Sequence, residues 1–90
     1  MATKMTSDQI AALFVARPGQ PRGDGATMYS LMAKQAAWLF DVFARETGPV
    51  PSRTGRRWAQ GVLADGRGWE ATEHKYGSAG MVVYSAKEAA

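Results

Sequence analysis

Cysteine is absent from this chain of 90 residues, and histidine occurs only once, at His74. Without thiols there is no disulfide framework, no thiolate metal site and no Cys-His catalysis, and a reducing compartment is expected. The sequence also lacks a signal-peptide pattern and an apolar run long enough to cross a membrane, because residues 1–5 are followed by Thr, Ser, Asp and Gln. We therefore expect a cytoplasmic protein that makes no membrane contact.

Catalytic groups are equally scarce. A Ser-His-Asp triad would need His74 and Asp65 beside a serine, and no serine lies in a nucleophile-elbow motif. Glu70 and Glu73 are three residues apart, which in a strand places them on opposite faces and argues against an acid/base pair. Residues 23–27 are glycine-rich but lack the Lys-Ser/Thr end of a P-loop. The sequence predicts a non-enzymatic protein with no cofactor and no metal.

The chain is mildly basic, with a net charge of +3 and a pI near 9.6, and the charge is unevenly placed. Residues 51–67 hold four arginines against a single acid, Asp65. A length of 90 residues leaves room for one small domain, which we place at residues 1–90. A local basic patch on one domain describes the sequence better than a uniformly basic protein does.

The first predicted helix begins at a capping box. Thr6 can accept from the backbone N–H of Gln9, whose side chain can reach back to Thr6. The helix must end near Arg17, because Pro18 disfavours helical geometry in the residue before it. Residues 17–26 contain two prolines and three glycines and predict a flexible loop.

The second predicted helix covers residues 27–47, with Thr27 as its N-cap and Gly48 followed by Pro49 as its end. Apolar positions recur through it at spacings of three and four, which is typical of a helix. These positions, with one glutamine among them, are Met28, Leu31, Met32, Gln35, Ala36, Leu39, Phe40 and Phe43. Such a wide apolar arc belongs to a central core helix or to half of a homodimer interface formed by the 27–47 helix.

The second half of the chain, residues 52–86, is rich in glycine and in residues that favour strands. It predicts three antiparallel strands at residues 58–64, 69–76 and 81–85, with Asp65-Gly66 as the first turn and residues 77–80 as the second. The expected fold class is α+β: two N-terminal helices within residues 6–48, followed by a C-terminal antiparallel three-stranded meander.

An alternative fold follows from the residues around Gly48. Residues 44–48 have the Ala-x-x-x-Gly spacing that resembles the turn of helix-turn-helix proteins, which implies a winged helix-turn-helix domain. A third helix at residues 52–65 would then be the recognition helix, and residues 77–80 the tip of a two-stranded wing. Gly55 and Gly61 would each cost about 1 kcal/mol inside that helix, which favours the meander.

Basic and aromatic side chains are interleaved in residues 52–76, around the single histidine. Cations neutralise phosphates and flat rings offer faces on which bases stack, so this mixture suits a nucleic-acid surface. The candidate nucleic-acid-binding residues are Arg53, Arg56, Arg57, Arg67 and Lys75. The candidate stacking or interface residues are Trp58, Trp69 and Tyr76, although the two tryptophans suit a core equally well.

We therefore expect a small binding protein whose leading ligand is nucleic acid, DNA or RNA, held through the Arg-rich segment. The alternative is a protein-protein interaction module or inhibitor, of the kind encoded by a phage or mobile element. Its support is the apolar arc of the second helix, the five methionines and a hairpin edge open to another strand.

Overall fold

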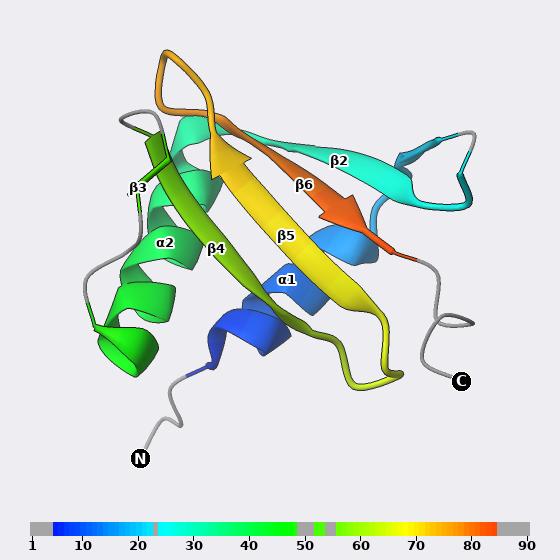
Figure 1. Ribbon diagram of the computed structural model, residues 1–90, viewed down its shortest axis with the longest axis horizontal. Helices are drawn as coiled ribbons and strands as arrows, with labels where there is room; N and C mark the ends of the chain where they lie inside the picture. The colour runs from blue at the N-terminus through cyan, green and yellow to red at the C-terminus, as the bar shows by residue number, and fades with distance from the viewer. Residues whose placement is uncertain (1–4, 23, 49–51, 54–55, 85–90) are drawn as a thin grey trace.

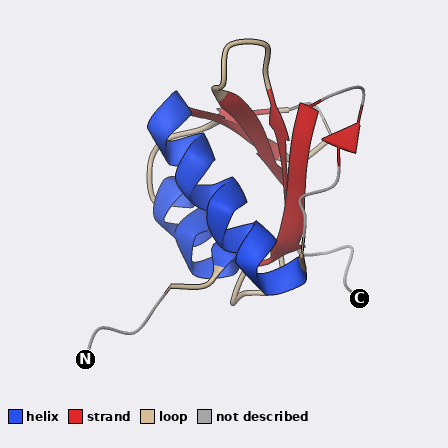
Figure 2. Ribbon diagram, turned by 90° about the vertical axis from the view of Figure 1, so that its left-hand side faces the viewer, coloured by secondary structure: helices blue, strands red, loops and turns tan. Residues whose placement is uncertain are grey.

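Two helices pack on one face of an antiparallel sheet (Figures 1 and 2). The computed structural model describes residues 5–22, 24–48, 52–53 and 56–84. Its elements are, in chain order, α1 (Ser7–Val15), β1 (Gln20–Pro21), β2 (Thr27–Leu31), α2 (Ala33–Thr47), β3 (Ser52–Arg53), β4 (Arg56–Val62), β5 (Gly68–Glu73) and β6 (Ala79–Val83). The strand order in the sheet is β1-β2-β6-β5-β4-β3. The fold is α+β, and along the chain α2 lies between strands β2 and β3.

The capping box predicted for the first helix is confirmed. Thr6 Oγ1 accepts from the backbone N–H of Gln9 at 3.1 Å, and Gln9 Oε1 accepts from the Thr6 N–H at 2.8 Å. The first turn of α1 is also held from α2, because the Glu46 carboxylate accepts from both the N–H and the hydroxyl of Ser7, at 2.8 and 2.6 Å. These contacts satisfy N–H groups that would otherwise lack partners at the start of the helix.

The predicted helix over residues 27–47 is wrong at its start. Thr27–Leu31 is strand β2, and α2 begins only at Ala33, where Gln35 Oε1 accepts from the Met32 N–H at 2.8 Å. In the strand, Leu31 is buried against the helices and its neighbour Ser30 is exposed. The homodimer through the 27–47 helix stays a prediction, although the continuous helix is divided into β2 and α2, and α2 buries Leu39, Phe40 and Phe43 in the core.

The predicted C-terminal three-stranded meander is also wrong, because the sheet draws on both halves of the chain. β4, β5 and β6 are consecutive neighbours as expected, but β6 also pairs with β2, from Thr27 opposite Val83 to Leu31 opposite Ala79. β1 adds to β2 from within the predicted loop at residues 17–26, and β3 adds to β4. The winged-helix alternative is wrong as well, since Arg56–Val62 is a strand rather than part of a third helix at residues 52–65.

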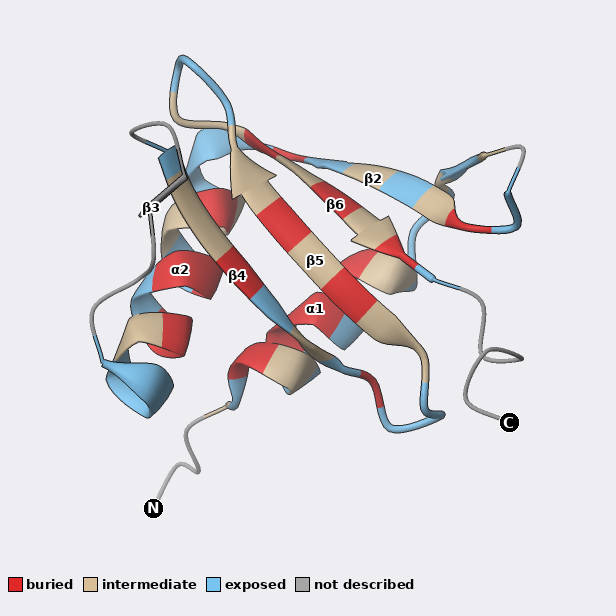
Figure 3. Ribbon diagram, viewed as in Figure 1, coloured by how far each residue is buried: buried red, intermediate tan, exposed pale blue. Residues whose placement is uncertain are grey.

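The core lies between the sheet and the two helices. Along the central strands, buried and less buried residues alternate, as Figure 3 shows. The largest fully buried side chains are Trp69, Phe40, Ile10, Leu39, Met81 and Val83. Small residues on β4, at Ala59 and Gly61, make room for this packing. No helix in the described part of the chain is both long and apolar enough to cross a membrane.

One polar group ties α1 to the sheet. Asp8 Oδ1 accepts from the Trp69 indole N–H at 2.7 Å and from the Val62 backbone N–H at 3.0 Å. Gly61 lies at this junction, where an added Cβ would overlap Asp8 Oδ1 and come within 2.7 Å of Trp69 Nε1. The absence of a side chain at Gly61 is therefore what lets helix, indole and strand meet.

Candidate functional site

The face of the sheet turned away from α1 and α2 is here called the open face, since no helix of the described residues covers it (Figure 2). Its residues alternate along each strand with the buried residues of the opposite face. They are Met28 and Ser30 on β2, Arg56, Trp58, Gln60 and Val62 on β4, Gly68, Glu70 and Thr72 on β5, Gly80 and Val82 on β6, and His74 and Tyr84 at the strand ends.

Two aromatic rings on the open face share one carboxylate. The Trp58 indole N–H donates to Glu70 Oε2 at 2.6 Å, and the Tyr84 hydroxyl donates to Glu70 Oε1 at 3.2 Å. Burial, the nearby Glu70 charge and this hydrogen bond raise the pKa of Tyr84. Both rings are thus fixed in place, Trp58 partly buried and Tyr84 40% exposed. The sequence analysis missed Tyr84, although its two-residue spacing from Val82 is the period of a strand.

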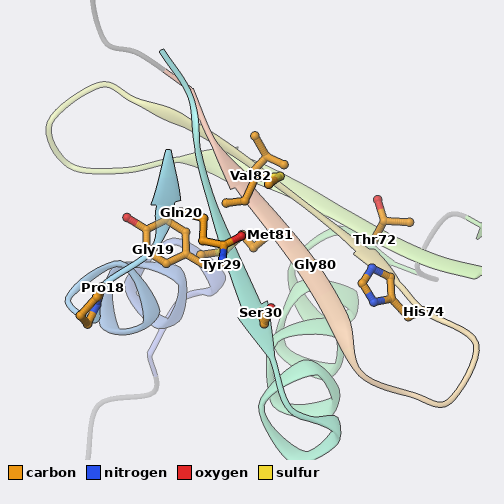
Figure 4. A pocket seen from close by; sticks show the side chains of 11 residues that line it. Pro18, Gly19, Gln20, Tyr29, Ser30, Thr72, His74, Gly80, Met81 and Val82 are labelled. Carbon is orange, nitrogen blue, oxygen red and sulfur yellow. The ribbon is translucent and has the colours of Figure 1, made fainter. Parts of the chain in front are cut away.

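A trough of about 570 Å³ lies across β2, β6 and the end of β5 (Figure 4). It follows a row of small residues on adjacent strands, where Thr72 lies opposite Gly80 and Gly80 lies opposite Ser30. The Val82 side chain on β6 and the His74 imidazole, just after the end of β5, line it together with Gln20 on β1 and Tyr29 on β2. The small residues of the row form part of its floor.

Arg57, a candidate nucleic-acid-binding residue, lies on the helix side of the sheet rather than on the open face. Its side chain donates to Glu73 Oε2 from Nε and Nη2, at 3.1 and 2.9 Å, and its backbone N–H donates to Oε1 at 3.1 Å. The guanidinium also lies 5.0 Å from the centre of the Phe40 ring and 3.9 Å from Asp41, both on α2. Arg57 therefore links β4, β5 and α2.

Arg56 is the candidate cation that the structure brings beside the aromatic pair. It is exposed, shares the open face with Trp58 by strand alternation, and has no ion-pair partner among the described side chains. The side chain of Arg53 lies outside the described residues. Lys75 and Tyr76 lie in the β5–β6 turn, with the Lys75 ammonium 5.6 Å from the Tyr76 ring and Tyr76 84% exposed.

The remaining candidates have structural partners. The Arg67 guanidinium pairs with Asp65 at 2.7 Å within the β4–β5 turn. The pKa of Asp65 is lowered, mainly because its carboxylate accepts a hydrogen bond from the Arg67 backbone N–H and also because it accepts one from the Arg67 side chain. Trp69 is 1% exposed in the core and offers no face to a ligand. Among the described residues, no three His, Asp or Glu side chains gather closely enough to hold a metal ion. The open face therefore offers aromatic rings on which a flat ligand can stack and polar side chains that can donate and accept hydrogen bonds.

The Arg57–Glu73 pair predicts a pH dependence of stability. Hydrogen bonds from the Arg57 side chain and backbone lower the pKa of Glu73, so the pair stabilises the fold above the unfolded-state pKa, and this is lost as the pH falls through the folded-state value. With the Arg57 side chain 38% exposed, solvent screening limits the contribution to about 1 kcal/mol. We expect Arg57→Gln to lower the free energy of unfolding in urea by that amount at neutral pH, and by progressively less in acid.

Arg56→Gln is the matched control for this prediction, since it removes an unpaired cation from the adjacent position and should leave the pH profile of stability unchanged. A free-energy difference between Arg57→Gln and the wild type that stays constant from neutral pH into acid would contradict the assigned role of Glu73.

Comparison of the chain with protein-family models, with curated proteins and with solved structures gives no significant match.

Proposed function

We propose that this protein binds single-stranded nucleic acid, DNA or RNA, on the open face of its sheet. The observation that carries the proposal is the pair of aromatic rings, Trp58 and Tyr84, anchored to Glu70. Arg56, which has no ion-pair partner among the described side chains, lies on the same strand as Trp58. Base stacking on an aromatic ring is tolerant of sequence and contributes about 1–3 kcal/mol per base. A ring already held by a hydrogen bond loses little conformational freedom when a base stacks on it.

The charges on the open face suit this arrangement. Glu70 lies between the two rings and holds both of them through its two carboxylate oxygens. Arg56 is the first residue of β4, two residues before Trp58 on the same face, where a phosphate of the bound strand would follow. Single strands are favoured over duplexes because the recognition helix expected at residues 52–65 is replaced by strands.

The proposal is tested by titrating fluorescently labelled single-stranded and duplex DNA and RNA with the protein, at low and near-physiological salt. We expect salt-sensitive binding of single strands, weakened about tenfold by Trp58→Leu. Arg56→Ala should weaken binding as well and should reduce the slope of log affinity against log salt by about one, because one phosphate contact is lost.

Arg45→Ala is the control for the charge effect, because Arg45 is also exposed but lies on α2, in the other layer. Each variant should keep the wild-type unfolding midpoint within experimental error before its affinity is compared. The proposal fails if single strands do not bind at low salt, or if Arg45→Ala and Arg56→Ala weaken binding equally.

A protein partner is the second candidate, because apolar side chains are exposed on the same face. Val62 is 56% exposed and Met28 39% exposed, and together with the aromatic pair they could form the centre of an interface. A protein partner is supported if no nucleic acid binds and if the protein, used as bait, captures a protein from the source cell. Val62→Asp should abolish this capture, whereas the control variant Leu13→Asp on α1 should not.

A further inference from the structure

We infer that the trough on the open face receives one unstacked nucleobase next to the base that stacks on Trp58. This inference rests on the proposed function and specifies where a second base goes. The ligand part that enters is a planar, uncharged ring with polar edges, while its phosphate stays outside. Three observations support the inference: the row of small residues, the chemistry of the lining and the adjacency to Trp58.

The row of small residues opens a space of the right form. On β6, an added Cβ at Gly80 would lie 3.0 Å from His74 Nε2 and 3.2 Å from His74 Cε1, so the imidazole packs over this glycine and forms part of the wall of the trough. Ser30 on one side and Thr72 on the other bring only a hydroxyl-bearing side chain each. The resulting volume of about 570 Å³ lies within the usual range for small-ligand sites.

The lining is polar at several points and carries no carboxylate, lysine or arginine. The hydroxyls of Ser30 and Thr72, the amide of Gln20 and the imidazole of His74 can donate or accept hydrogen bonds. Met28 and Val82 supply apolar contact surface. A base satisfies both kinds of surface, whereas a phosphate would find no lysine or arginine among the lining residues.

The trough also continues the row in which Trp58 lies. Trp58 is opposite Thr72 on the neighbouring strand, and Thr72 lines the trough. Trp58 and Gly80 are two strand spacings apart, about 10 Å, so a ring on Trp58 and a ring in the trough are within reach of successive nucleotides of one strand. Arg56, beyond Trp58 on the same face, is then placed for the connecting backbone.

The test uses the full chain with Gly80→Val, which fills the trough. Gly80 is not among the glycines with positive φ, and a β-branched residue suits a strand, so the fold should survive with a small shift of His74. The probes are a short single-stranded oligonucleotide and copies of it in which one nucleotide at a time is abasic. Binding is measured by fluorescence anisotropy at low salt.

We expect wild-type protein to lose about tenfold in affinity when the abasic site falls at the nucleotide seated in the trough. The Gly80→Val variant should bind the intact oligonucleotide about tenfold more weakly than the wild type does. It should bind the abasic copy with the same affinity as the wild type, and this equal affinity also shows that the variant is folded. The inference would be overturned if Gly80→Val binds the intact oligonucleotide as tightly as the wild type does and loses the same affinity at the abasic site, even if Trp58→Leu still weakens binding. Failure of every oligonucleotide to bind would overturn the proposed function as well.

Discussion

Replacement of Gly61 by alanine is expected to destabilise the protein by about 3 kcal/mol or more. The new methyl group would occupy the position of Asp8 Oδ1 and crowd the Trp69 indole, so α1 must move away from β4 or the indole must leave its site. Either response breaks a hydrogen bond that is partly shielded from water and disturbs the packing of the largest core side chain. The free energy of unfolding in urea, followed by circular dichroism, measures the effect.

Gly68→Ala provides the matched control, because Gly68 lies on the paired strand of the same hairpin. There, an added Cβ would meet its nearest atoms at 3.8 and 3.9 Å, which is ordinary contact distance. We expect this variant to remain within about 0.5 kcal/mol of the wild type. Equal stability of Gly61→Ala and Gly68→Ala would show that the close approach at Gly61 does not restrict the fold.

Removal of the Asp8 carboxylate should cost nearly as much. Asp8→Ala leaves the buried Trp69 N–H and the Val62 N–H without their acceptor, and we expect a loss of about 3 kcal/mol in the free energy of unfolding. Trp69→Phe removes the indole donor while keeping an aromatic ring. A double-mutant cycle of the two substitutions should give a coupling energy of about 1–2 kcal/mol.

Asp41→Ala controls for the loss of a carboxylate in general, since Asp41 is exposed on α2 and its nearest cation, Arg57, is 3.9 Å away. We expect little change in this variant. A coupling energy near zero between Asp8→Ala and Trp69→Phe would mean that the indole N–H finds another acceptor, and that Asp8 acts mainly through the backbone of β4.

Local signals in the sequence predicted local features of the fold. Thr6 and Gln9 gave the capping box, and Asp65-Gly66 gave the first hairpin turn, in which Gly66 has a φ of 92°. The segment Thr27–Leu31 was misjudged because Met28 and Leu31 satisfy a helical spacing of three, while the residues between them also alternate as a strand does. Only pairing with β6, about fifty residues away, decides between the two, and no local pattern carries that information.

The candidate site was less predictable than the fold. Arg56 and Arg57 are adjacent, so a strand through them must place them on opposite faces, but the predicted strand began only at residue 58. Contact between Trp58 and Glu70 depends on the register across two strands. The second turn comes earlier than the predicted loop at residues 77–80. β5 ends at Glu73 rather than at residue 76, the His74 N–H donates to the Ser78 carbonyl, and β6 begins at Ala79.

The pairing of β2 with β6 also sets the order in which the protein can fold. β4, β5 and β6 follow one another in sequence and can form early from local contacts, whereas β2 must close a loop that contains α2 and three strands. Before β6 pairs with β2, no strand lies beside Leu31, and the backbone groups on that edge of β2 have no hydrogen-bond partners from β6. Formation of the trough is therefore a late event, because its Ser30 and Gly80 sides come together only when this last, longest-range pairing is made.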